Sequence, residues 1–188
     1  EIVLGGWYMP RVRAGDGIHG SVRAVAAAAG RAVAAGFQAI EIHAAHGYLI
    51  SQFLDPLSNE RDDEYGGDLN GRVRFLLEIV DAVRGVVPDT LPVLVRISAT
   101  DWAAGGWDLD QTILVSKMLK EHGVDLVDVS TGGIVAGASI PVKPNYQVPS
   151  ADHVRAKADV PVAEGGLIPH PKQAEQLTIN GEADSVAA

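Results

Sequence analysis

The segment Ile40–Leu57 reads IEIHAAHGYLISQFLDPL, and it is the part of the sequence around which the rest is organised. It begins as an apolar strand and ends in a polar loop. Two histidines and a tyrosine, His43, His46 and Tyr48, lie at the junction between the two. Such a concentration of titratable and hydrogen-bonding side chains at the end of a buried element predicts the substrate-facing edge of an active site.

The composition is that of a globular protein with one sizeable core. The chain has 188 residues, of which 47% are hydrophobic, so disorder is not a serious candidate. Its formal net charge of −9 argues against nucleic acid and against an anionic membrane surface as the main partner. The sequence contains no cysteine, which excludes disulfides and thiolate chemistry within it and fits a cytoplasmic protein.

The ends of the sequence carry no targeting signal that we can identify. Residues 1–10 lack the basic start and apolar centre of a signal peptide, and no apolar run is long enough to span a bilayer. The first residue is not methionine, so we expect the chain to be part of a longer protein.

Helical and strand patterns alternate along the chain, which predicts βα units and a parallel sheet. Frequent glycines predict an irregular N-terminal segment over residues 1–20 and one folded domain over residues 21–188. Helices are predicted over Val22–Ala35 with Ser21 as N-cap, Gly71–Val87, from Asp108 or Asp110 to Gly123, Ser150–Ala158 and Lys172–Ile179. Strands are predicted over Phe37–Ile42, Leu91–Ile97, Val124–Val129, Val160–Ala163 and Asp184–Ala188.

Two fold classes have this α/β order. A doubly wound sheet requires a glycine-rich turn after its first strand, but the first strand here is followed by HAAHGY. A βα barrel places its active site at the carboxyl ends of the strands, where this chain has polar residues and the pairs Gly132–Gly133 and Gly165–Gly166. We therefore favour a partial barrel, with three of its eight strands missing.

Several motifs resemble the Old Yellow Enzyme family of FMN-dependent ene-reductases. HAAHGYLISQFL (His43–Leu54) is followed by PLSNERDDEYGG (Pro56–Gly67), VRISATDW (Val95–Trp102) and VDLVDVSTGG (Val124–Gly133), in the family's order. The segment 160–168 fits as well, and the pair of histidines resembles the bacterial, thermophilic-like branch.

The resemblance covers roughly residues 21–188 and implies a fold, cofactors and a reaction. The fold is a (β/α)8 TIM barrel, of which this chain would supply strands four to eight. FMN would bind at the carboxyl ends of the strands, and NAD(P)H would be the reductant. The reaction implied is reduction of an activated C=C bond of an α,β-unsaturated carbonyl compound, by hydride transfer from flavin N5 and proton donation. A homo-oligomer is expected from the family's tendency.

His43 and His46 are the strongest catalytic and substrate-binding candidates. A neutral imidazole can donate one hydrogen bond, and two donors aimed at one carbonyl oxygen stabilise a developing enolate. The resemblance assigns proton donation and substrate contact to Tyr48 and places His43 beside the flavin. A metal site at H-x-x-H has no obvious third ligand nearby, and the alternative of satisfied polar residues at a strand end stays open.

Arg96 is a charged residue inside an otherwise apolar strand, so it requires a partner. It either pairs with a carboxylate, for which Glu41 is a candidate, or faces a ligand. In the family the matching arginine lies against the flavin N1–C2=O edge. Gly165 and Gly166 would let backbone N–H groups reach the FMN phosphate, with turn formation as the alternative.

Three further interpretations remain open at this stage. A dense polar loop is predicted to be a self-bonded scaffold behind the site: Asn59, Arg61, Glu64, Tyr65 and Arg72. The chain could instead be the barrel part of a dienoyl-CoA reductase or trimethylamine-dehydrogenase-like multidomain flavoenzyme, or a non-catalytic half-barrel remnant. Neither the physiological substrate nor the preference for NADH or NADPH follows from the sequence.

Overall fold

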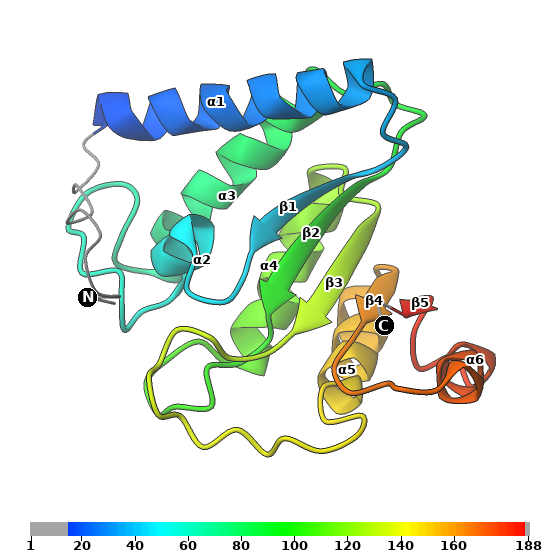
Figure 1. Cartoon of the computed structure of the whole chain (residues 1–188). Helices are drawn as coiled ribbons and strands as arrows, with labels where there is room; N and C mark the ends of the chain where they lie inside the picture. Colours follow the sequence, from blue (N-terminus) through cyan, green and yellow to red (C-terminus); the bar gives the residue numbers. More distant parts are fainter. Residues whose placement is uncertain (1–14, 187–188) are drawn as a thin grey trace, which may run out of the picture.

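A single sheet of parallel strands runs through residues 15–186, which are the residues that the computed structural model describes (Figure 1). Its strand order is β1-β2-β3-β4-β5, and every neighbouring pair is parallel. The strands are β1 (Ile40–Ala44), β2 (Val93–Ser98), β3 (Leu126–Ser130), β4 (Val162–Glu164) and β5 (Ser185–Val186). The predicted parallel α/β architecture is confirmed.

Helices precede or follow each strand along the chain. They are α1 (Gly15–Ala34), α2 (Leu49–Leu54), α3 (Leu69–Arg84), α4 (Leu109–Glu121), α5 (Val148–Ala158) and α6 (Pro171–Ile179). Of these, α3, α4 and α5 pack against one face of the sheet. Asp68 and Asp108 cap α3 and α4, since each carboxylate accepts a hydrogen bond from the backbone N–H three residues further on. The predicted start of α4 at an aspartate is therefore confirmed.

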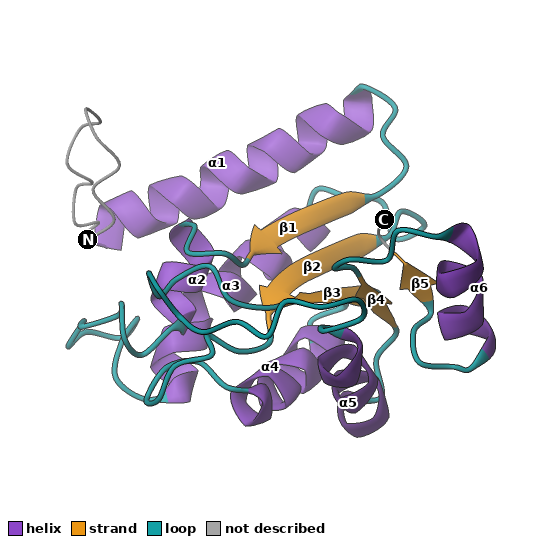
Figure 2. Ribbon diagram, turned by 60° about the horizontal axis from the view of Figure 1, so that its bottom comes forward, coloured by secondary structure: helices purple, strands orange, loops and turns teal. Residues whose placement is uncertain are grey.

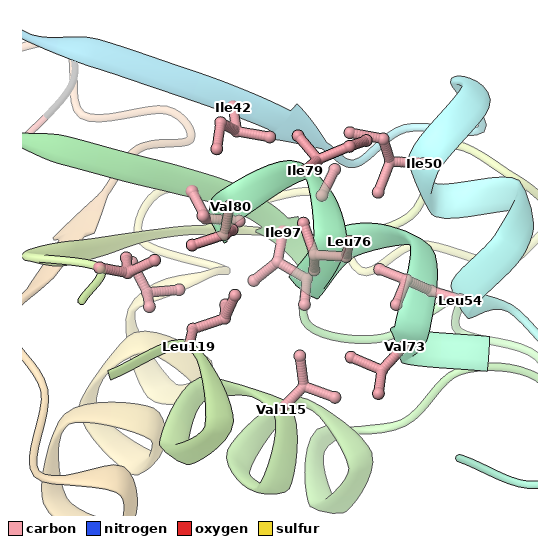
Figure 3. Close-up of a cluster of buried hydrophobic side chains, with 14 of the residues drawn as sticks. Ile42, Ile50, Leu54, Val73, Leu76, Ile79, Val80, Ile97, Val115 and Leu119 are labelled. Atoms are coloured by element: carbon pink, nitrogen blue, oxygen red, sulfur yellow. The ribbon is translucent and has the colours of Figure 1, made fainter. Parts of the chain in front are cut away.

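The main core lies between the sheet and the helices α3 and α4 (Figure 3). Residues that alternate along each strand, such as Ile42 and Ile97, point to this side and meet Leu76, Ile79 and Leu119. The four aliphatic residues Leu76, Ile79, Val80 and Leu119 are each 0% exposed. Because this apolar layer packs against the helices, the other face of the sheet points away from them.

The predicted starts of α1 and α5 are wrong. That of α1 lies too late in the chain. The segment predicted to be irregular up to Gly20 is already helical from Gly15, and residues 1–14 lie outside the described part. Ser21 is no cap, because its hydroxyl donates to the carbonyl of Gly17 at 2.8 Å, one turn back inside the helix. The buried Ile18 and the packing of α1 on α3 outweigh the poor helix propensity of the glycines.

The predicted N-cap Ser150 of α5 lies within that helix, which begins at Val148 with Pro149 in its first turn. Proline suits this position because its missing N–H would have no partner there. The short helix α2 was not predicted at all. Among residues 15–186, no helix combines the length and the apolar character needed to cross a membrane.

Candidate active site

The carboxyl ends of β1, β2 and β3 lie side by side, and the loops that follow them gather at this edge (Figure 2). In register, His43 of β1 is opposite Arg96 of β2, which is opposite Asp128 of β3. These residues lie on the side of the sheet that faces away from α3 and α4. We call this side, with Glu41, His43, Arg96, Asp128 and Ser130, the polar face.

The structure brings the three predicted catalytic side chains together. The ring centroids of His43 and His46 are 5.3 Å apart, and those of His43 and Tyr48 are 5.2 Å apart in an edge-on arrangement. Tyr48 occupies the N-cap position of α2, beside the end of β1, and is 64% exposed. The sharp turn between β1 and α2, where His46 and Gly47 both have positive φ, therefore places Tyr48 beside His43.

Both histidines are neutral near pH 7. Burial lowers the pKa of His43, and the positive charge of Arg96 lowers it further. The pKa of His46 is lowered by the same two causes in the same order, with a smaller contribution from His43. A neutral imidazole has one donor and one acceptor nitrogen, so each ring can donate one hydrogen bond to a ligand oxygen.

Arg96 forms an ion pair with a carboxylate, and its side chain is also partly exposed on the polar face. Its Nε lies 3.5 Å from Oδ2 of Asp128, and the arginine side chain is 31% exposed. Glu41, the partner suggested from sequence, lies close enough to feel the charges of both Asp128 and Arg96, but the ion pair of Arg96 is with Asp128. Burial raises the pKa of Asp128, and burial followed by the charge of Asp128 raises the pKa of Glu41. The ion pair and the ligand-facing role are therefore compatible.

A second pair of carboxyls lies beneath the histidines. Asp55 and Asp101 are each 2% exposed, and they line a small cavity together with His46. The carboxyl of Asp101 accepts a hydrogen bond from the backbone N–H of Trp107 at 2.6 Å. Burial, with the nearby Asp55, raises the pKa of Asp101 to about 7. Asp101 is therefore about half protonated near pH 7.

Gly165 and Gly166 follow β4, which is separated in the sheet from β1 and its histidines by β2 and β3. Gly166 has a φ of 100°, and a methyl group there would lie 2.5 Å from the side-chain oxygen of Gln147. The turn therefore requires glycine on account of the chain itself. Contact between these glycines and a phosphate stays a prediction.

The polar loop after α2 is the predicted self-bonded scaffold. The amide nitrogen of Asn59 donates to the carbonyls of Phe53 and Tyr65 at 2.5 and 2.8 Å. Arg72 donates to the carbonyls of Leu54 and Gly67, both at 2.8 Å. These bonds tie α2 to α3 and so fix the position of Tyr48 at the start of α2.

Sequence reasoning missed three polar residues of the site, which are Ser98, Asp128 and Ser130. The backbone N–H of His46 donates to Ser98 Oγ at 3.1 Å, and Ser130 Oγ lies 2.7 Å from His46 Nε2. Strand alternation would have found them, since in register they lie on the same face as Arg96. Within residues 15–186, no three His, Cys, Asp or Glu side chains gather closely enough to hold a metal ion.

Parallel βα units with polar side chains gathered at the carboxyl ends of the strands are typical of the α/β class, whose barrels and open sheets place their active sites at this edge. The chain belongs to the NADH:flavin oxidoreductase / NADH oxidase family, whose sequence profile matches residues 8–188. The resemblance predicted from the motifs is thus confirmed, and it extends further towards the N-terminus than predicted.

Curated relatives include two bacterial NADPH dehydrogenases. That of Bacillus licheniformis is 48% identical over 171 residues, which are 91% of this chain and 50% of the relative. That of Geobacillus thermodenitrificans is 50% identical over 169 residues, which are 90% of this chain and 49% of the relative. The chain thus spans about half the length of the curated relatives it matches.

Solved structures with the same fold include two reductases of different length. A 2-naphthoyl-CoA reductase complex matches with a TM-score of 0.86 and 30% identity, over 94% of this chain and 27% of that one. Morphinone reductase matches with a TM-score of 0.75 and 29% identity, over 96% of this chain and 47% of that one.

Proposed function

We propose that this chain forms strands four to eight of a (β/α)8-barrel flavoenzyme that uses FMN and NAD(P)H to reduce activated C=C bonds of α,β-unsaturated carbonyl compounds. The observation that carries the proposal is the pair of neutral imidazoles, His43 and His46, with ring centroids 5.3 Å apart at the end of β1. Two neutral donors so close together suit one carbonyl oxygen, where negative charge develops during reduction.

Each residue has a distinct proposed role. His43 and His46 bind and polarise the carbonyl oxygen, and His43 also borders the flavin. Tyr48 gives the proton to the α-carbon, a role that its exposure and its edge-on contact with the His43 ring support. Gly165 and Gly166 are proposed to offer backbone N–H groups to the FMN phosphate.

The residues present fit an isoalloxazine ring. Arg96 Nε is buried and makes no hydrogen bond within the described chain, although its guanidinium lies on the polar face beside His43. A fixed positive charge there suits the electron-rich N1–C2=O edge of a flavin, and Asp128 holds the arginine in place. When bound, FMN supplies the hydride that reaches the β-carbon. The residues of this chain then position the acceptor and supply the proton.

A second candidate is the barrel part of a longer multidomain flavoenzyme acting on an enoyl thioester. The likeness to the 2-naphthoyl-CoA reductase favours it, since its TM-score of 0.86 exceeds the 0.75 of morphinone reductase. The two candidates differ in the acceptor. Oxidation of NAD(P)H with cyclohexenone supports the first, and oxidation with only an enoyl-CoA thioester supports the second.

The first experiment is to purify the chain as given, add FMN, remove free flavin by gel filtration and record the absorption spectrum. A retained flavin spectrum supports a flavin-binding unit within these residues. Loss of all flavin would leave the chain a non-catalytic remnant unless the full-length protein retains FMN. For that protein we also propose a small-molecule enone substrate, a homo-oligomeric state and a cytoplasmic location.

A further inference from the structure

His46 is held through both its backbone and its ring. Its backbone N–H donates to Ser98 Oγ at 3.1 Å, and that hydroxyl donates to the carbonyl of Gly132 at 2.8 Å. Its ring Nε2 lies 2.7 Å from Ser130 Oγ. Ser98 and Ser130 are partners in register at the ends of β2 and β3, so both bonds reach His46 from the rigid sheet.

The backbone conformation at His46 and the close approach of the loop after β3 also restrict this residue. It has a φ of 58°, in the left-handed region that few side chains adopt, and Gly47 follows with a φ of 75°. A methyl group on Gly133 would lie 2.5 Å from the His46 Cα, so the loop after β3 is pressed against this turn. The ring therefore has little freedom to exchange which nitrogen faces Ser130.

The contact with Ser130 decides where the imidazole carries its hydrogen. Ser130 is 1% exposed, and its hydroxyl hydrogen has two acceptors within reach: His46 Nε2 at 2.7 Å and the Ile97 carbonyl at 3.4 Å. The Ile97 carbonyl is too far away for a normal O–H···O bond. If Nε2 carried the hydrogen and donated to Oγ, the buried hydroxyl hydrogen would have no good acceptor, so donation from the hydroxyl to Nε2 is favoured. If the hydroxyl donates to Nε2, then Nε2 carries no hydrogen and Nδ1 carries it. Within residues 15–186, Nδ1 makes no hydrogen bond.

We propose that Ser130 is a positioning residue that holds the neutral His46 ring in the Nδ1–H tautomer, so that Nδ1–H is the hydrogen offered to a ligand oxygen. With the opposite tautomer, Nδ1 would present a lone pair to that oxygen and would repel it. The identity of the ligand rests on the proposed ene-reductase function, whereas the tautomer does not.

The tautomer is measured by long-range proton–nitrogen correlation spectra of protein labelled with ¹⁵N-histidine, without flavin or substrate. The His46 signals are those absent from His46→Gln. We expect a protonated Nδ1 in the wild type, a shift towards protonated Nε2 in Ser130→Ala, and a return to protonated Nδ1 in Ser130→Thr, which keeps the hydroxyl. Ser116→Ala is the matched control, since Ser116 is a buried serine of α4 whose hydroxyl has no hydrogen-bond partner within residues 15–186.

A protonated Nε2 in the wild type would overturn the proposal, as would an unchanged spectrum in Ser130→Ala. If Ser130→Ala does not fold, the wild-type and Ser130→Thr spectra still decide, because both must carry the hydrogen on Nδ1.

In the flavin-loaded protein, Ser130→Ala should weaken phenol binding about tenfold while FMN binding is unchanged. Loss of the tautomer preference with normal phenol binding would contradict the link to ligand binding. A correct tautomer without any phenol binding would instead contradict the proposed function.

Discussion

Alternate residues of β1, β2 and β3 point to opposite faces of the sheet, and the two faces differ in the polarity of their side chains. On the helix-facing side, Ile42, Val95, Ile97, Val127 and Val129 are apolar and at most 4% exposed. On the polar face, the same strands carry the charged and titratable side chains Glu41, His43, Arg96 and Asp128.

The comparison shows that the fold and the site depend on different residues and on different physical requirements. Burial of the apolar face is non-directional, so many combinations of aliphatic side chains of similar volume would support the same sheet. The polar face depends on register, because a shift by one residue would turn His43 and Arg96 towards the helices. Substitutions on the helix-facing side should therefore act on stability, and those on the polar face should act on ligand binding.

The largest effect is expected for Phe75→Ala on the helix-facing side. Phe75 is 0% exposed and its ring centroid is 4.5 Å from that of Phe53, so truncation leaves a cavity between α2 and α3. We expect a loss of about 3–5 kcal/mol in the free energy of unfolding, measured by urea denaturation. Leu114→Ala, which truncates a side chain 48% exposed on α4, is the control and should change stability little. Equal losses in both variants would contradict the assignment of the core.

Glu164 breaks the rule of an apolar helix-facing side, and its removal should stabilise the protein. It is 0% exposed, neither carboxyl oxygen has a hydrogen-bond partner in the described chain, and burial together with Glu182 and Asp152 raises its pKa to about 7. The folded state thus holds the proton more tightly than the unfolded state, whose pKa is about 4.3. Its contribution to stability is greatest below the unfolded pKa and is lost as the pH rises towards about 7.

Glu164→Gln removes this titration. We expect it to match the wild type in stability near pH 4 and to exceed it by about 3 kcal/mol at pH 8, in thermal or urea unfolding across that range. Glu175→Gln, on the exposed side of α6, is the matched control and should run parallel to the wild type. A constant difference between Glu164→Gln and the wild type at all pH values would show that Glu164 is not the titrating group.

Arg96→Gln tests the polar face. It removes the fixed positive charge beside His43 while keeping a side chain that can donate a hydrogen bond. We expect FMN binding to weaken about thirtyfold, measured by flavin fluorescence titration, together with some loss of folding stability, because the buried Asp128 loses its ion-pair partner. Arg155→Gln, at an arginine paired with Asp184 away from the polar face, should bind FMN normally. If the two variants bind FMN alike, Arg96 serves only the ion pair with Asp128.

Much of this organisation could be predicted from the sequence, because burial leaves a periodic signal. The apolar runs of Leu91–Ile97 and Val124–Val129 correctly predicted parallel strands, and aspartate correctly marked the start of α4. Helix α2 was missed because LISQFL is too short to show a period. The start of α1 was misplaced because tertiary packing overrides the low propensity of glycine.

The site was predictable only in part. His43, His46 and Tyr48 are close in sequence, so their meeting followed from a single turn. Ser98 and Ser130 reach His46 from positions 52 and 84 residues away, and only the register of β1, β2 and β3 brings them there. Asp128 was missed as the partner of Arg96 for the same reason.

The central claim is that the two histidines at the end of β1 together bind one ligand oxygen. It is tested most directly by titrating the flavin-loaded protein, wild type and His43→Ala/His46→Ala, with a phenol and with cyclohexenone, following the flavin absorption spectrum. The proposed role predicts that the double variant retains FMN but binds both ligands at least about tenfold more weakly, because two donors are lost. Unchanged binding of both ligands by the double variant would contradict it.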